Sequence, residues 1–71
     1  MNDDIKDIAM RIKDLRDIYN ISLETLARDL GINQSLYQQY ENGESDIPIG
    51  VLKKIAEKFN VEFITLITGR V

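Results

Sequence analysis

The sequence contains no cysteine and no histidine. Without cysteine, the chain can form no disulfide framework and offers no thiolate nucleophile. Without histidine, it lacks the commonest general base and the commonest metal ligand of proteins. A catalytic or metal site would have to rest on carboxylates, serine or lysine alone, and no glycine-rich phosphate loop is present. We therefore expect that the protein is not an enzyme and that it holds no metal and no cofactor.

Long apolar runs are also missing, so we expect no segment to span a membrane. The first four residues, Met1 to Asp4, are polar and acidic, unlike a secretory signal, and we expect a cytoplasmic protein. The formal net charge is −3. This charge disfavours a nucleic-acid partner, because phosphate binding usually leaves a basic surface. The objection stays open, because the local distribution of charge matters more than its sum.

The 71 residues are enough for one domain, which we expect to cover 1–71 with a modest core. Apolar residues recur at helical spacing, as in Ile5, Ile8, Ile12, Leu15 and Ile18. No segment alternates with a period of two, so the expected fold class is all-α. The pattern predicts five short helices, at about 4–19, 23–30, 34–41, 48–59 and 62–68.

Capping residues mark the ends of these helices. Ser22 and Asn33 are expected N-caps, because their side chains can accept from free backbone N–H groups. Gly31 is expected to end the helix 23–30 in the left-handed conformation. Pro48 suits the first turn of the fourth helix, where its missing N–H costs nothing. Asn60 is expected to follow the end of that helix.

The helices 23–30 and 34–41 are expected to cross steeply, because the turn between them is short. Ala27 is small enough to let them approach closely, and Gly31 supplies the positive φ of the turn. Tyr37 and Tyr40 are expected to anchor the second of these helices to the core. Its other face carries the polar residues Gln34, Ser35, Gln38 and Gln39.

This polar face suits DNA recognition. Glutamine can bond bidentately to adenine, and serine can bond to several base edges. A helix fits the major groove, and backbone N–H groups at helix N-termini near Ser22 and Asn33 can hold phosphates without a side-chain cation. An ordinary solvated helix face is the alternative interpretation of the same four residues.

Three pieces of sequence carry a resemblance to a known family. They are Leu26-Ala27 before Gly31, then Tyr40-Glu41-Asn42-Gly43, then Leu52 to Ala56 before the last helix. With them, the stretch from Ile12 to Gly69 resembles the Cro and phage-repressor type of helix-turn-helix domain, also called the xenobiotic-response-element type. The resemblance implies a compact five-helix bundle of the phage-repressor DNA-binding type, with the helix-turn-helix at its second and third helices.

The resemblance also implies roles for individual residues. Arg16 and Glu41 take the positions of a partly buried structural ion pair. The base-contacting positions are those of Gln34, Ser35 and Gln39, with Gln38 close to that face. Contacts to the DNA backbone are expected at Ser22, Arg28, Asn33 and Asn42. The implied partner is double-stranded DNA, bound as a homodimer, and the implied function is that of a sequence-specific transcriptional regulator.

Three departures from the family indicate weak affinity for DNA, or help from another part of a larger protein. Leu23 replaces a phosphate-contacting glutamine, the loop from Glu44 to Asp46 is acidic, and Tyr37 replaces a small branched residue. The acidic loop and the net charge favour an alternative function, that of a protein-interaction or antitoxin-like module with the same fold and without strong DNA binding. The segment from Glu41 to Gly69 is also similar to regulators in which such a head precedes a cupin-type sensing domain, so a C-terminal sensing domain absent from this chain is a further expectation.

Several surface residues leave alternatives open. Arg11 and Lys13 are expected, with Arg28, to lie near the groove and contact the DNA backbone. A solvated face or phosphate steering are the two interpretations of Lys53, Lys54 and Lys58. A dimer seam or core are the two interpretations of Phe63, Ile64, Ile67 and Val71.

Overall fold

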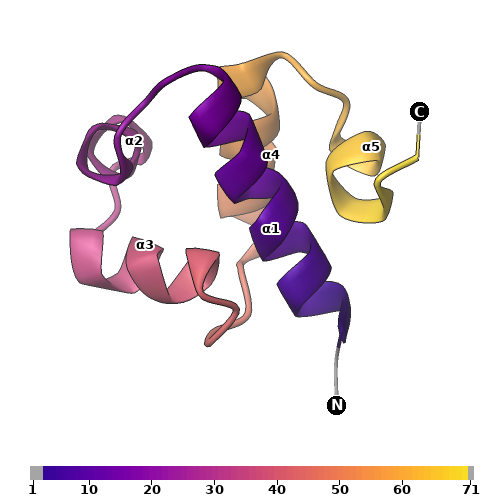
Figure 1. Ribbon diagram of the computed structural model, residues 1–71, viewed down its shortest axis with the longest axis horizontal. Helices are drawn as coiled ribbons and strands as arrows, with labels where there is room; N and C mark the ends of the chain where they lie inside the picture. The colour runs from indigo at the N-terminus through magenta and orange to yellow at the C-terminus, as the bar shows by residue number, and fades with distance from the viewer. Residues whose placement is uncertain (1–2, 71) are drawn as a thin grey trace.

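The computed structural model describes residues 3–70, which form five helices (Figure 1). The helices are α1 (Asp3–Ile18), α2 (Leu23–Leu30), α3 (Gln34–Glu41), α4 (Ile49–Phe59) and α5 (Phe63–Thr68). No strand occurs among residues 3–70, and the expected all-α, five-helix fold is confirmed. None of these helices is long and apolar enough to cross a membrane. The domain expected over 1–71 includes Met1, Asn2 and Val71, which lie outside the described residues.

The fourth helix begins one residue later than the expected start. Pro48 is its N-cap and not part of its first turn, because ψ of 147° is extended while φ of −59° would fit either position. The Pro48 carbonyl accepts hydrogen bonds from the N–H groups of Val51 and Leu52, both at 3.0 Å, and so starts the helix. In the same way Glu62 caps α5, which begins at Phe63.

The turn between α2 and α3 forms as its residue types predict. Ser22 Oγ accepts from the Thr25 N–H at the start of α2, and Asn33 Oδ1 accepts from the Leu36 N–H at the start of α3. Gly31 has φ of 72°, and the Ile32 N–H donates back to the Ala27 carbonyl at 2.9 Å. This hydrogen bond closes the end of α2 and fixes the direction in which α3 leaves.

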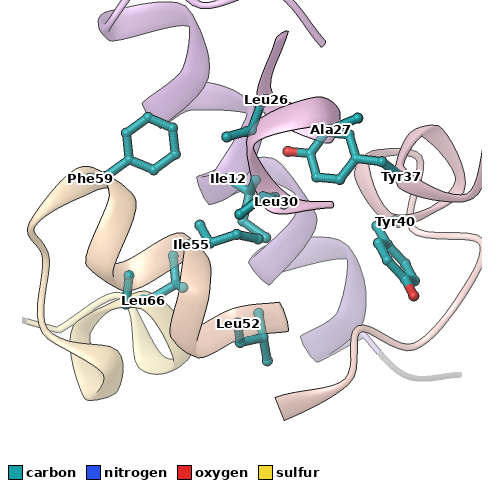
Figure 2. Packing of buried hydrophobic residues seen from close by; sticks show 11 residues of the cluster. Ile12, Leu26, Ala27, Leu30, Tyr37, Tyr40, Leu52, Ile55, Phe59 and Leu66 are labelled. Atoms are coloured by element: carbon teal, nitrogen blue, oxygen red, sulfur yellow. The ribbon is translucent and has the colours of Figure 1, made fainter. Parts of the chain in front are cut away.

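All five helices contribute to one core (Figure 2). Its largest fully buried side chains are Ile12, Leu26, Tyr37, Ile55 and Leu66. α3 packs against α1 and α2, whereas α5 packs against α1 and α4. α3 therefore lies at one side of the bundle, as Figure 1 also shows, and has one face free of other helices.

Ile18 belongs to the apolar pattern that predicted the first helix, but it does not lie in the core. Ile18 is 74% exposed, whereas Ala9 is 2% exposed and takes a place in the core. At 100° per residue, Ile18 lies about 120° around the helix from the buried Ile12, and Ala9 only about 60°. Each step of three residues rotates the position by about 60° around the helix, so the two steps from Ile12 through Leu15 to Ile18 leave Ile18 facing away from the core.

The apolar residues of α5 divide between the two expected interpretations. Phe63 and Ile67 are half-buried and pack against the core. Ile64 is 62% exposed and is free to contact another molecule. Val71 lies outside the described residues.

Candidate nucleic-acid interface

α3 turns its tyrosines to the core and its glutamines to solvent. Tyr37 and Tyr40 are 0% and 6% exposed, and their rings meet edge to face with centroids 6.4 Å apart. The four residues expected to contact bases are all exposed, namely Gln34, Ser35, Gln38 and Gln39. These four span about 140° of the helix circumference. They can therefore face a single groove together.

Two neighbours of this polar face were not singled out in the sequence. Leu36 is 40% exposed at its edge, where an apolar side chain can contact a thymine methyl group. Ser45 Oγ lies 3.1 Å from Gln39 Oε1 and donates a hydrogen bond to it. This bond orients the Gln39 amide and leaves its NH₂ group free to donate. At 100° per residue, Leu36 lies about 40° around the helix from the buried Tyr40 and about 60° from the exposed Gln39, so helical spacing alone does not decide its exposure.

An ion pair between α1 and α3 holds the polar face in place. Arg16 Nε donates to Glu41 Oε2 at 2.7 Å, and Nη2 donates to Oε1 at 3.1 Å. The third nitrogen, Nη1, donates to the Ile21 carbonyl at 2.9 Å. The hydrogen bond to Glu41 raises the pKa of Arg16 against the opposing effect of burial. Arg16 thus joins α1, the turn after it and the C-terminal end of α3.

The side chains at the two helix N-termini are committed to capping. Ser22 Oγ lies 2.9 Å from Thr25 Oγ1 and also accepts from the Thr25 N–H. Asn33 Oδ1 accepts from the Leu36 N–H at 3.2 Å. Both residues are exposed. A phosphate at either helix start would therefore meet backbone N–H groups and not the side-chain oxygens.

The end of α3 offers no backbone donors. The N–H groups of Asn42, Gly43 and Glu44 donate to the carbonyls of Gln38, Tyr40 and Gln39, at 2.9 to 3.1 Å. These three N–H groups are therefore not free to donate to a phosphate, and the contact to the DNA backbone at Asn42 stays a prediction. The exposed Asn42 side chain remains available for such a contact.

Arg11 does not lie at the groove surface, contrary to expectation. Its Nε donates to the Leu66 carbonyl at 2.8 Å and its Nη2 to the Ile67 carbonyl at 2.7 Å. Arg11 thus binds the last carbonyls of α5, where a cation is favourable. Arg28 is exposed on α2, the first helix of the helix-turn-helix, and its contact with the DNA backbone stays a prediction.

The α4 lysines are exposed, and one of them makes a defined contact. Lys58 Nζ lies 2.9 Å from Asp29 Oδ2 of α2. The hydrogen bond from Lys58 lowers the pKa of Asp29. This pair joins α2 and α4 at the surface, away from the polar face of α3. Within residues 3–70, no three His, Cys, Asp or Glu side chains gather as a metal site.

Lys13 has a neighbour that the sequence did not single out. Lys6 lies seven residues before Lys13 on α1. Both lysines line a shallow groove beside Asn42 and Gly43. Seven residues are close to two full turns, so the two lysines share one side of the helix. Their position beside the end of α3 depends on the packing of α1 against α3, which no local pattern reveals.

Comparison with known proteins agrees with this geometry. The chain is 32% identical over 60 residues to Antitoxin PezA of Streptococcus pneumoniae, an alignment covering 84% of this chain and 38% of the relative. It is 38% identical over 50 residues to a Pyrococcus abyssi protein whose name describes an HTH-type transcriptional regulatory protein, covering 70% of this chain and 16% of the relative. The chain thus spans less than half the length of either relative. No solved structure is significantly similar to it.

The family comparison covers most of the chain. The family described as "Helix-turn-helix" matches residues 12–66, which include all of α2, α3 and α4. The match contains the turn at Gly31 and both partners of the Arg16–Glu41 ion pair. The resemblance in the sequence is thereby confirmed at the level of the family, and the chain belongs to the helix-turn-helix family of the Cro/C1 type.

Proposed function

We propose that the chain is the sequence-specific DNA-binding domain of a transcriptional regulator and that α3 enters the major groove. The observation that carries the proposal is the two-sided character of α3. One side is fixed in the core by Tyr37 and Tyr40, while the other presents three glutamines and a serine to solvent. Amide side chains on a rigid helix can hydrogen-bond to base edges, and adenine is the base that glutamine fits bidentately.

Contacts to the DNA backbone would position this helix. The first-turn N–H groups of α2 and α3, next to Ser22 and Asn33, can hold phosphates without a cation. Arg28 adds a positive charge beside the same helices. The net charge of −3 disfavours DNA binding, but these groups lie on the surface that would meet the duplex, and the local charge there decides the affinity.

We also propose that the chain binds DNA as a homodimer. Domains of this kind bind two half-sites about one helical turn apart. An apolar groove of about 230 Å³ between α1 and α5 includes Ile18, which is 74% exposed, and Val61. Together with the exposed Ile64 of α5, this groove is the proposed seam between the two copies. The chain acts as a binding domain in this proposal and not as an enzyme.

Selection of bound sequences from a random duplex pool tests the proposal. We expect enrichment of a motif with two related half-sites, about 10 base pairs from centre to centre. Binding should weaken steeply as salt rises, because phosphate contacts release counterions. If a dimeric form of the protein enriches no motif at low salt, sequence-specific binding is wrong.

The similarity to an antitoxin favours a second candidate function, that of an antitoxin-like module that binds a protein. The acidic, exposed residues Glu44 and Asp46 lie in the loop after α3 and would suit a basic protein surface. Co-expression with the product of a neighbouring gene would test this function. Rescue of growth from a toxic neighbour, with no enriched DNA motif, would favour it over the first candidate.

The cupin-type sensing domain stays a prediction from the resemblance. Both relatives are longer than the aligned segment, which is compatible with a DNA-binding head attached to another domain. The full-length open reading frame is the measurement that checks it.

A further inference from the structure

A basic groove runs between α1 and the loop that follows α3. It has a volume of about 320 Å³. Its lining residues come from one side of α1 and from the end of α3, and they are Lys6, Ala9, Met10, Lys13, Glu41, Asn42 and Gly43. In Figure 1 the end of α3 and its loop point toward the N-terminal half of α1, in agreement with this lining. The groove therefore begins where the polar face of α3 ends.

The charge of this groove is positive, although that of the chain is negative. Its one carboxylate belongs to Glu41, which is 4% exposed and already paired with Arg16 at 2.7 Å. Asp7 and Asp14 lie about 80–100° around α1 from Lys6, on the side away from α3. Asp17 follows at the end of α1, 3.8 Å from the Arg16 guanidinium. Among the side chains of residues 5–70, neither Lys6 nor Lys13 takes part in an ion pair, and these two lysines supply the positive charge of the groove.

Lys6 is held against the loop by its packing on a glycine. Gly43 has φ of 72°, and a β-carbon at that position would lie 3.1 Å from Lys6 Cγ. The absence of a side chain at Gly43 lets the aliphatic part of Lys6 lie against the loop while its ammonium group reaches solvent. The exposed Met10 occupies the surface between Lys6 and Lys13.

A phosphate beside Asn42, Gly43 and Glu44 can be bound there only by side chains. The N–H groups of Asn42, Gly43 and Glu44 already donate to carbonyls of α3. The side chains that remain are the two lysines and the exposed Asn42 amide. This situation differs from the start of α2, where backbone N–H groups themselves can meet a phosphate.

We infer that Lys6 and Lys13, together with the Asn42 amide, bind phosphates of the DNA strand that passes the C-terminal end of α3. The inference rests on the proposed function, because it assumes that α3 lies in the major groove. It assigns to the N-terminal half of α1 a direct role in binding the duplex. The contact is independent of sequence, since it involves phosphates and not base edges.

The test is the salt dependence of binding to a duplex of random sequence, by the wild type and by the Lys6→Gln/Lys13→Gln variant. Each lost phosphate contact lowers the slope of log K against log salt by about 0.9, so we expect a loss of about 1.8 per bound chain. The ratio of the wild-type affinity to the affinity of the variant should then fall about 12-fold between about 50 and about 200 mM salt. The matched control is Lys53→Gln/Lys54→Gln on α4, which removes the same charge from exposed positions outside the groove.

Three outcomes are decisive. A lower slope for the α1 variant and an unchanged slope for the α4 variant would support the inference. Equal slopes for the wild type and the α1 variant would overturn it. If the slopes are equal and only the thermal stability of the α1 variant falls, the lysines stabilise the C-terminal end of α3 through its carbonyl groups and do not bind phosphates. If the wild type itself shows no salt-dependent binding, the proposed function fails, and the inference fails with it.

Discussion

Arg16 and Glu41 are 25 positions apart in the sequence and are joined by two hydrogen bonds, at 2.7 and 3.1 Å. Their side chains are 14% and 4% exposed. The pair connects α1 with α3, the helix that faces the proposed groove. Its geometry therefore sets the position of α3.

Removing the arginine should destabilise the protein strongly. In Arg16→Ala, the Glu41 carboxylate stays buried without its cation, and we expect the free energy of unfolding to fall by about 3 kcal/mol. Arg16→Lys keeps the charge but loses the forked geometry, and we expect an intermediate loss. Urea unfolding checks both values. Lys53→Ala, at an exposed position of α4, should change stability by no more than about 0.5 kcal/mol. A similarly small loss for Arg16→Ala would show that the pair does not hold α3.

A buried hydroxyl in the core should be dispensable for folding. Tyr37 is 0% exposed, and its hydroxyl group forms no hydrogen bond of good geometry with the part of the chain that the structure describes, although the Glu41 carboxylate is close enough to raise its pKa. A buried polar group without a partner costs about 1–3 kcal/mol. We expect Tyr37→Phe to raise the free energy of unfolding by about 1 kcal/mol, as measured by urea unfolding. Tyr40→Phe is the matched control, since Tyr40 lies at the edge of the same cluster. A destabilised Tyr37→Phe variant would contradict this prediction.

The same hydroxyl should make stability depend on alkaline pH. Burial raises the pKa of Tyr37 above its usual range, and the nearby Glu41 carboxylate raises it further. In the unfolded chain a tyrosine ionises near pH 10, at about its ordinary pKa. Above that pH the unfolded state has released a proton that the folded state retains, so the free energy of unfolding falls as pH rises.

Urea unfolding between about pH 9 and about pH 11 measures this effect against Tyr37→Phe, which lacks the group. The stability that the protonated Tyr37 hydroxyl contributes is fully present below about pH 10. Above about pH 10, the difference in the free energy of unfolding between the wild type and the variant should change with a slope approaching about 1.4 kcal/mol per pH unit. The remaining tyrosines and the lysines are present in both proteins, so their titration cancels. Parallel curves for the two proteins would show that Tyr37 ionises as easily in the fold as outside it.

The turn between α2 and α3 depends on a positive φ and not on close packing. Gly31 has φ of 72°, and a β-carbon there would meet no atom within 4 Å. We expect Gly31→Ala to lower the free energy of unfolding by about 1 kcal/mol, which is the conformational cost alone. Asparagine tolerates this conformation better, so Gly31→Asn should lose less. If Gly31→Ala and Gly31→Asn lower the thermal stability equally, the asparagine side chain must clash with neighbouring atoms.

Local chemistry explains which parts of the structure the sequence could predict. The N-caps at Ser22 and Asn33 and the left-handed Gly31 each depend on a few neighbouring residues, and all three form as expected. The polar and buried sides of α3 follow from helical spacing, because its tyrosines are three residues apart. These features define the helix-turn-helix.

The wrong or missing predictions concern contacts between residues far apart in the chain. Arg11 was assigned to the groove surface, yet it binds carbonyls of α5, 55 and 56 positions away. Lys6 had no motif of its own, and its place beside Gly43 results from the packing of α1 on α3. A cation on an amphipathic helix has no local signal for which neighbour it will meet.

We expect one set of residues to determine which DNA sequence is preferred and another set to determine the affinity for all sequences. Gln34→Ala and Gln39→Ala each remove an amide from the free face of α3, so we expect them to relax base preference at individual positions, by about 1–3 kcal/mol each. Arg28→Ala removes a charge from α2 and should weaken binding to all sequences alike, with a salt slope lower by about 1. Ser45→Ala provides a finer comparison, because it keeps the Gln39 amide and removes only the hydroxyl that orients it.

Affinities for the preferred duplex and for its single-base variants measure these effects. Gln39→Ala and Ser45→Ala should alter discrimination at the same base position, and the serine variant should do so less. Arg28→Ala should leave the ratios between duplexes unchanged. If the glutamine variants and Arg28→Ala all act uniformly across sequences, the outward face of α3 does not contact base edges, and the amides are an ordinary solvated surface.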